Sequence, residues 1–360
     1  MSDNQENIIG FSSTIPVEIL LAAGRRPCDL NNLFITDPGS LQLVAAAEEA
    51  GFPATSCAWI KGIYAAVHRH RLRRVIAVVT GDCSSTHALA EVLAHDGIEV
   101  IPFGFPLDRQ PAAMSAALEQ LAARLGVSLA AAEEERRQLL PVRRQLAELD
   151  RLTWEENLVS GEENHRWLVA ASDFNGDPER FAAELDDFLA LAAARPPRPA
   201  AVRLGIIGVP TICGNLYQEL ENLGAAVVFN EVQRQFSMPG PADRDLCRQY
   251  LDYTYPYPVA GRVADIRREA ARRRLDGLIH YVQSFCFRQI EDIIVKRELD
   301  LPVLTLEADR PGPVDGRTLT RLETFVEMLR ARRSRRPNVN KSAPAVRLSD
   351  GGRRDGSQPF

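Results

Sequence analysis

Three of the six cysteines in the 360-residue chain stand at the start of a predicted helix: Cys57, Cys83 and Cys286. Cys83 and Cys286 also stand at junctions between a predicted strand and a predicted helix. The free N–H groups of a helix N-terminus and the positive end of its dipole lower a thiol pKa, so such positions favour the thiolate that binds metals. In doubly wound sheets these junctions gather along the carboxyl edge, where ligands bind. The three thiols are therefore candidates for one shared site. Iron–sulfur clusters are held by such thiolates, and three protein ligands would leave one iron open to substrate.

Position alone leaves alternatives open for all six cysteines. Free cysteine is among the most often buried residue types, so a cysteine at a helix start is commonly structural. Cys213 also lies between a predicted strand and a predicted helix, and nothing in its position excludes it as a ligand. Cys28, in a predicted loop, and Cys247, inside a predicted helix, are expected to be structural.

Several motifs are absent, and their absence limits the function. The chain has no G-x-x-x-x-G-K-[ST] loop, so it should not hydrolyse ATP itself. It has no C-x-x-C pair and no G-x-S-x-G elbow, which argues against a zinc ribbon, thioredoxin-type redox chemistry and an α/β-hydrolase nucleophile. The apolar stretches are too short to span a membrane, and the acidic N-terminus lacks the features of a secretory signal. We therefore expect a cytoplasmic protein without disulfides.

Two stretches of the chain alternate apolar strand-like runs with amphipathic helices, the pattern of parallel α/β sheets. Residues 8–108 and 200–330 are predicted to form two α/β domains, and residues 109–199, which lack strand signals, a helical insertion and linker. Strands are expected at residues 8–13, 74–80, 98–103, 202–208, 225–229, 277–282 and 302–306. Helices are expected at residues 16–23, 57–68, 84–95, 214–223, 260–274, 287–297 and 317–332.

Charge is unevenly distributed along the chain. The formal net charge of −5 separates into −11 for residues 1–330 and +6 for residues 331–360. This last segment is rich in Arg, Pro, Ser and Gly and has little to bury, so we expect a disordered basic tail. It lacks interleaved aromatic residues and any nucleic-acid-binding motif, so no nucleic-acid partner is expected.

The candidate cysteines lie in motifs that resemble the 2-hydroxyacyl-CoA dehydratase and benzoyl-CoA reductase family. The matching pieces follow one another at residues 15–24, 56–61, 81–84, 230–236, 284–286 and 304–309. The resemblance implies two flavodoxin-like, or Rossmann-like, parallel-sheet domains joined by a helical region. It also implies a 4Fe-4S cluster held by Cys57, Cys83 and Cys286, and leaves out Cys213.

The resemblance extends to other candidate site residues. It implies that Ser12 or Ser13, together with Glu18, faces the cluster or the substrate, the alternative being ordinary capping and surface polarity. Arg234 could hold a CoA phosphate or a substrate carboxylate through bidentate hydrogen bonds, the alternative being a solvated arginine.

In this family a separate activator, with its own ATP site and cluster, injects one low-potential electron. The electron reduces the thioester carbonyl of a bound acyl-CoA to a ketyl radical anion, which weakens the bond at C2 and expels the hydroxyl as water. The resemblance thus implies an anaerobic hydro-lyase with an acyl-CoA substrate, an ATP-dependent activator, and a homologous second subunit or a second copy as partner. Two alternatives remain open: a benzoyl-CoA-type reductase subunit, and a non-catalytic subunit for electron relay or structure.

Overall fold

Two four-stranded sheets, each with every strand parallel, form the framework of the protein in a computed structural model that describes residues 6–335. The strand order is β2-β1-β3-β4 in the first sheet and β6-β5-β7-β8 in the second. The strands are β1 (Ile8–Phe11), β2 (Arg26–Asp29), β3 (Arg74–Thr80), β4 (Glu99–Gly104), β5 (Val202–Gly208), β6 (Ala225–Asn230), β7 (Gly277–Gln283) and β8 (Val303–Ala308). Both sheets have the flavodoxin-like order, which confirms the predicted fold class.

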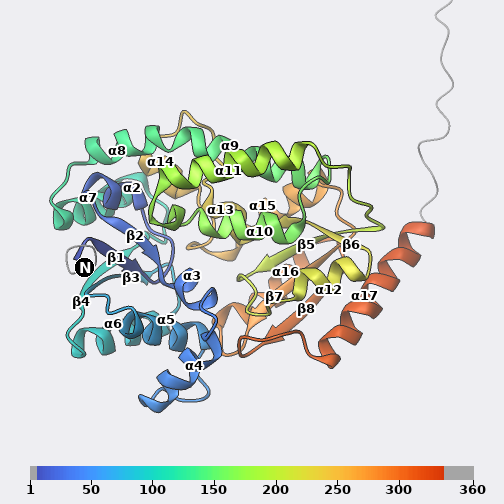
Figure 1. Cartoon of the computed structure of the whole chain (residues 1–360), viewed down its shortest axis with the longest axis horizontal. Coiled ribbons are helices and arrows are strands. Elements are labelled where there is room, and N and C mark those ends of the chain that lie inside the picture. Colours follow the sequence, from blue (N-terminus) through green and yellow to red (C-terminus); the bar gives the residue numbers. More distant parts are fainter. Residues whose placement is uncertain (1–5, 336–360) are drawn as a thin grey trace, which may run out of the picture.

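Helices connect the strands of each sheet, and a further group of helices, which follows the first sheet in the chain, lies along one side of both sheets (Figure 1). The first sheet carries α2 (Val17–Ala22), α3 (Leu30–Ile35), α4 (Ser40–Glu49), α5 (Ala58–Arg69) and α6 (Ser84–His95). The intervening helices are α7 (Pro111–Leu125), α8 (Leu129–Gln138), α9 (Leu140–Trp154), α10 (Gly161–Ala170), η1 (Phe174–Gly176) and α11 (Pro178–Ala193). The second sheet carries α12 (Leu216–Asn222), α13 (Glu231–Phe236), α14 (Leu246–Asp252), α15 (Val259–Arg272), η2 (Phe287–Gln289), α16 (Asp292–Glu298) and α17 (Gly316–Arg335).

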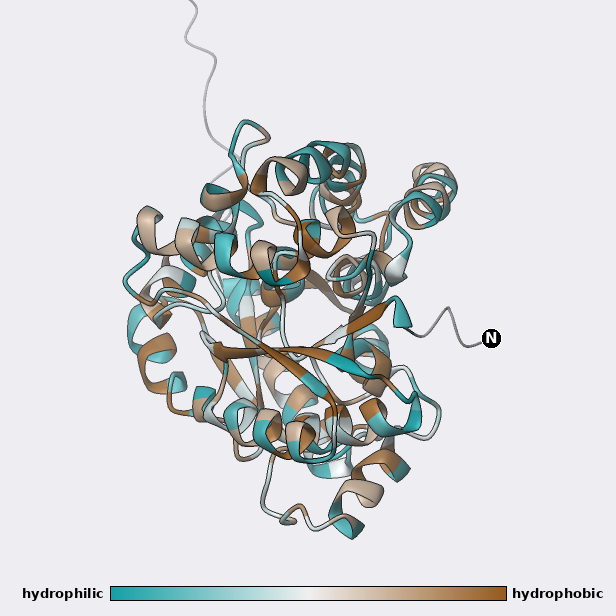
Figure 2. Ribbon diagram, turned by 90° about the vertical axis from the view of Figure 1, so that its left-hand side faces the viewer, coloured by the Kyte–Doolittle hydropathy of each residue, from teal (hydrophilic) through white to brown (hydrophobic). Residues whose placement is uncertain are grey.

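The strands are the most apolar part of each half, as the colouring in Figure 2 shows. Every residue of β7 is buried, because helices cover both faces of this central strand, and most of β3 and β5 is buried as well. Continuous apolar runs of this kind are what a parallel sheet covered on both faces requires.

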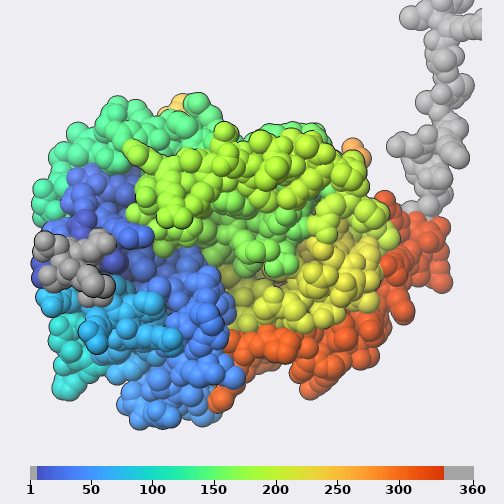
Figure 3. Space-filling view, viewed as in Figure 1, coloured from blue at the N-terminus to red at the C-terminus, as the bar shows by residue number. Residues whose placement is uncertain are grey.

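The intervening helices lie along one side of both sheets (Figure 3). Their apolar faces share one core with the first sheet and with α14, through side chains such as Phe11, Leu146 and Tyr250. Helix α10 also packs against β6 of the second sheet. The helical region therefore holds the two sheets in a fixed relation.

Helices α3, α4 and α13 were not predicted, and the structure differs from the sequence-based elements in three further places. Cys28 lies in β2 and not in a loop; the strand was missed because Pro27 interrupts its pattern, although proline is tolerated in an edge strand. The helix expected at residues 287–297 is instead the 3-10 turn η2 followed by α16. In that turn the buried Arg288 donates a hydrogen bond to the carbonyl oxygen of Tyr255.

The third difference concerns the predicted basic tail. Residues 331–335 continue α17, because alanine and arginine favour helix and the first proline comes only at Pro337. The rest of the predicted tail lies outside the described residues. Within residues 6–335, no helix combines the length and apolar character needed to cross a membrane.

Candidate functional site

The carboxyl ends of the central strands of both sheets line a single cavity of about 140 Å³. Ser12 and Ser13 follow β1, Asp82 follows β3, Thr211 follows β5, and Gln283 ends β7. In each sheet the chain leaves these paired central strands in opposite directions, which opens a crevice at the carboxyl edge. The two crevices face each other, so one cavity collects side chains from both halves.

Cys57, Cys83 and Cys286 all line this cavity, which we call the cysteine cavity. Each is the N-cap residue of the helical segment after it: Cys57 of α5, Cys83 of α6, and Cys286 of the turn η2. The structure thus brings together the three thiols that the sequence placed in one site.

The pKa values of the three thiols differ from the sequence-based expectation. Burial raises the pKa of Cys57 to about 12, and burial likewise raises the pKa of Cys83 and of Cys286. Backbone N–H groups in the first turns act in the expected direction and lower each pKa, but the loss of hydration outweighs them. Charge on Cys83 or Cys286 also raises the pKa of Cys57, so the three sulfur atoms interact electrostatically.

The donor set of the cysteine cavity is of the kind that binds iron–sulfur clusters. Within residues 6–335, no three His, Cys, Asp or Glu side chains lie close enough together to hold one metal ion. A four-iron cluster is larger, and its cysteine ligands stand around it at correspondingly greater separations. Three thiols on three chain segments, arranged around one cavity, fit that type of ligation by their chemistry.

The other three cysteines lie elsewhere. Cys213, which its position alone left open as a ligand, lines a different cavity. Cys28 lies in β2, where burial raises the pKa of its thiol to about 12. The Sγ atom of Cys247, in α14, contacts the carbonyl oxygen of Pro111 at 3.5 Å.

The two serines that the resemblance implied line the cysteine cavity, but their surroundings differ. Ser12 is buried, and its Oγ accepts a hydrogen bond of 3.0 Å from the backbone N–H of Val78. Ser13 is less buried. The hydroxyl of Ser12 therefore ties β1 to β3, and Ser13 is the better placed of the two to contact a ligand.

Glu18 does not line the cysteine cavity, contrary to the expectation that it faces the cluster or the substrate. Its fully buried carboxylate accepts hydrogen bonds from Arg143 (2.6 Å), Gln249 (2.7 Å) and Tyr250 (2.8 Å). The positive charge of Arg143 holds the pKa of Glu18 below its usual value against the opposing effect of burial. These contacts turn the side chain toward α9 and α14, so Glu18 joins helices.

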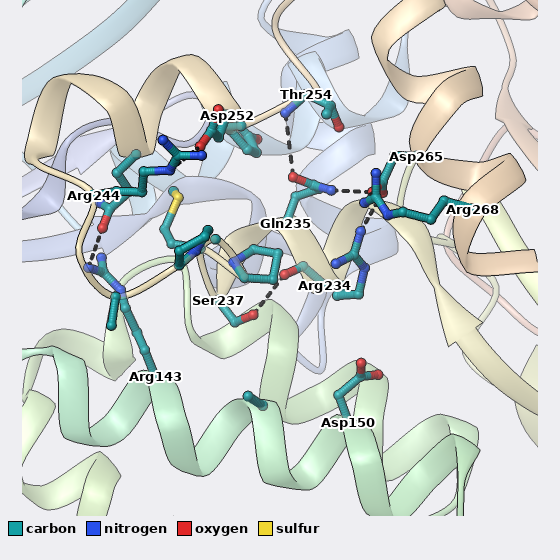
Figure 4. A pocket seen from close by; sticks show the side chains of 18 of the residues that line it. Arg143, Asp150, Arg234, Gln235, Ser237, Arg244, Asp252, Thr254, Asp265 and Arg268 are labelled. Carbon is teal, nitrogen blue, oxygen red and sulfur yellow. Dashed lines mark hydrogen bonds and ion pairs between the residues drawn. The ribbon is translucent and has the colours of Figure 1, made fainter. Parts of the chain in front are cut away.

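Arg234 lines a second, larger cavity of about 660 Å³, which we call the arginine cavity. Its guanidinium forms a buried ion pair with Asp265 (Figure 4). Arg234 is thus neither at the surface nor beside the three cysteines.

The sequence analysis missed His165, which lines the cysteine cavity from α10. Burial lowers the pKa of its imidazole to about 4, so the ring is neutral at pH 7. The amide nitrogen of Gln233 lies 3.1 Å from Nδ1 and can only donate, so the ring proton is on Nε2. The ring of Tyr217 packs against the imidazole with centroids 5.0 Å apart.

Arg288, Asp82 and Asp29 are the Arg and Asp side chains that line the cysteine cavity, and the sequence analysis did not single them out for this role. The guanidinium of Arg288 lies 4.0 Å from the ring centroid of Tyr255 and is almost fully buried. Burial raises the pKa of Asp82 to about 6, while the charge of Arg288 acts to lower it. Arg288 is therefore a fixed positive charge beside the thiols.

Comparison with known proteins places the chain in a family. No curated protein matches the chain. Residues 12–329 match the family described as 2-hydroxyglutaryl-CoA dehydratase, D-component, as the sequence motifs predicted. The matched range includes all three cysteines of the cavity and every strand of the two parallel sheets except β1. Because the match covers most of the chain, the protein belongs to the 2-hydroxyglutaryl-CoA dehydratase D-component family.

Proposed function

We propose that the chain is the cluster-bearing component of a 2-hydroxyacyl-CoA dehydratase, a hydro-lyase. The family gives the general activity, a component of a dehydratase acting on a hydroxyacyl-CoA. The observation that carries the finer proposal is the cysteine cavity, where thiols from three separate chain segments meet at the facing edges of two sheets. Cys57, Cys83 and Cys286 are the proposed ligands of a 4Fe-4S cluster.

When bound, such a cluster would supply an electron and an open iron, acting as a Lewis acid on a substrate oxygen. The chain's own residues prepare the cavity for that chemistry. Arg288 places a positive charge in the cavity, which favours the thiolate form of Cys286 and would offset the negative charge of a thiolate-bound cluster. His165 remains neutral and offers its Nε2–H as a hydrogen-bond donor to the thioester carbonyl oxygen, where negative charge develops on reduction.

The proposed reaction removes water from C2 and C3 of the acyl chain after one-electron reduction of the thioester. The electron must come from another protein, because this sequence contains no P-loop with which to couple ATP hydrolysis to a low-potential transfer. We therefore propose an ATP-dependent activator as the electron donor. Since the extra electron is regained when the enoyl product forms, one injection supports many turnovers.

The test is made on the full chain, produced and purified without oxygen. We expect a brown protein with about four iron and four sulfide per chain and a reducible cluster detected by EPR spectroscopy. With an ATP-dependent activator and the partner subunit, a 2-hydroxyacyl-CoA should yield the enoyl-CoA and water, followed by mass spectrometry.

The Cys57→Ala variant is the control for that assay, since it should lack both the iron and the turnover. A colourless, iron-free wild-type protein would refute the cluster. A cluster-containing protein that reduces the ring of an aromatic acyl-CoA and leaves 2-hydroxyacyl-CoA unchanged would refute the dehydratase assignment.

A further inference from the structure

The arginine cavity has a strong excess of basic side chains. Nine arginines and three aspartates line it, contributed by the helical region, α13 to α15 and the loops between them. Figure 4 shows Arg143 and Arg244 on one side of the cavity, and Arg234 and Arg268 around Asp265 on the other. Converging guanidinium groups in a hollow of about 660 Å³ are suited to an anionic ligand of considerable size.

Carboxylates within the protein neutralise only part of this charge. Arg143 is paired with Glu18, and Arg234 with Asp265. Over residues 6–335, Arg109 and Arg144 have no carboxylate within ion-pair distance; Arg109 lies over the ring of Tyr257 and donates to a backbone carbonyl. Arg109 and Arg144, both exposed to solvent, thus place at the cavity two guanidinium charges that no carboxylate of the described chain pairs, and an anionic ligand could reach both.

Buried donors without acceptors mark the same cavity. Arg143 is 7% exposed and Arg234 is 6% exposed, yet the Nε–H group of each has no hydrogen-bond partner within the described chain. The hydroxyl of Thr254, which also lines the cavity, lacks a partner too. A buried unsatisfied donor costs about 1–3 kcal/mol, so such donors in one cavity indicate a missing acceptor.

The arginine cavity and the cysteine cavity lie on opposite sides of the same two chain segments. In α13, Gln235 lines the arginine cavity and the next residue, Phe236, lines the cysteine cavity. In the segment before α15, Thr254 lines the arginine cavity and Tyr255 the cysteine cavity. The two cavities therefore share these two segments as a common wall and are close neighbours in the fold.

We propose that the arginine cavity binds the diphosphate group of a nucleotide. Guanidinium groups bind phosphate oxygens through paired, charge-assisted hydrogen bonds, and a diphosphate offers enough acceptors for several arginines at once. Two sources carry this chemistry, the nucleotide end of a CoA thioester and a free nucleoside diphosphate. The first source rests on the proposed function: a CoA thioester is expected here only if its thioester end reacts in the neighbouring cysteine cavity.

Isothermal titration calorimetry on the purified full chain tests the proposal, with inorganic pyrophosphate, CoA, ADP and pantetheine as probes. We expect pyrophosphate and at least one of the two nucleotides to bind, with affinity falling as salt rises, and pantetheine, which has no phosphate, to bind far more weakly. Tighter binding of CoA than of ADP identifies CoA as the source, whereas tighter binding of ADP identifies a free nucleotide.

Arg144→Gln and Arg109→Gln should each weaken pyrophosphate binding roughly tenfold, the value of one charge-assisted contact. Arg124→Gln is the matched control, since this exposed arginine at the end of α7 lies outside the cavity. This variant should bind pyrophosphate with the affinity of the wild type. Equal weakening by all three variants, or no binding of pyrophosphate, CoA and ADP to the folded wild type, would overturn the proposal. Because the titration needs neither iron nor turnover, an iron-free protein that still binds pyrophosphate would refute the cluster and leave this site standing.

Discussion

At the scale of single residues, the cysteine cavity sets two effects against each other. First-turn N–H groups lower the pKa of each thiol, and burial raises it more. Neighbouring thiols add to the rise for Cys57 and Cys286, and the charge of Asp82 adds to it for Cys83. Without a cation the three thiols are therefore protonated at pH 7, so cluster assembly has to release their protons. Arg288 is the buried side chain whose charge eases that step for Cys286.

The three ligand candidates could be predicted from the sequence because helix starts have a clear local pattern. His165 could not, since it reaches the cysteine cavity from α10, more than a hundred residues from Cys57 and from Cys286. Glu18 was misplaced for a related reason. Its neighbours in sequence suggest the carboxyl edge of the first sheet, but its hydrogen-bond partners come from α9 and α14.

His165 should give the protein a measurable loss of stability in acid. Burial lowers its pKa from 6.5 to about 4, so between these values the unfolded chain binds a proton that the folded chain does not. The stability present above pH 6.5 is therefore lost as the pH falls toward 4, by about 3 kcal/mol at most. Urea unfolding at pH 7, 6 and 5 should show a smaller loss for His165→Gln than for the wild type. Parallel losses in the two proteins would contradict the buried neutral imidazole.

At the scale of elements, glycines at strand ends position the cavity. Gly81, between β3 and Cys83, has φ +94, and a Cβ atom there would lie 2.7 Å from Pro256 Cβ. Gly208, at the end of β5, has φ +97, and a Cβ atom there would lie 2.1 Å from the carbonyl oxygen of Tyr281. Only glycine fits where each chain turns away from its sheet so sharply.

Gly81→Ala should lower the iron content, because the added methyl group displaces the loop that carries Cys83. Gly97→Ala is the matched control: Gly97 has φ +84, but no atom lies within 4 Å of the added Cβ. Both substitutions should cost roughly 1–3 kcal/mol of backbone strain, measured by urea unfolding. Iron analysis should show a loss only for Gly81→Ala, and equal iron in the two variants would argue against this role.

The strongly patterned elements, β3, β5 and β7, could be predicted from sequence, and short or interrupted ones could not. Strand β2 has four residues, and one of them is Pro27. The turn η2 looks helical by composition, but Arg288 turns inward to the Tyr255 carbonyl, a tertiary contact with no local signal. Tertiary contacts of this kind determine the structure of short elements, and the hydrophobic periodicity of a local sequence window does not reveal them.

At the scale of the whole molecule, large apolar side chains are exposed beside Cys286. Phe285, Phe287, Ile290, Ile293 and Ile294 are each between 41% and 70% exposed, and they lie within ten residues of one another. Exposed apolar side chains in one place usually mark a protein–protein contact. Because permanent subunit interfaces are more apolar than transient ones, we propose this surface as the contact with a partner subunit and not with an activator.

Ile290→Asp together with Ile293→Asp should therefore weaken subunit association without unfolding the chain, since both side chains already face water. Sedimentation velocity should show a dimer, with itself or with a homologous subunit, for the wild type and a monomer for the double variant. Leu191→Asp, at an equally exposed leucine of α11, should leave the dimer intact. A double variant that associates as well as the wild type would refute the assignment.

The iron content of six single cysteine variants, purified without oxygen, tests the central claim most directly. Cys57→Ala, Cys83→Ala and Cys286→Ala should each lose the cluster, so that iron falls from about four per chain to nearly none. Cys28→Ala, Cys213→Ala and Cys247→Ala should keep it, because these thiols lie outside the cysteine cavity. Equal iron in all six folded variants would contradict the assignment of the site.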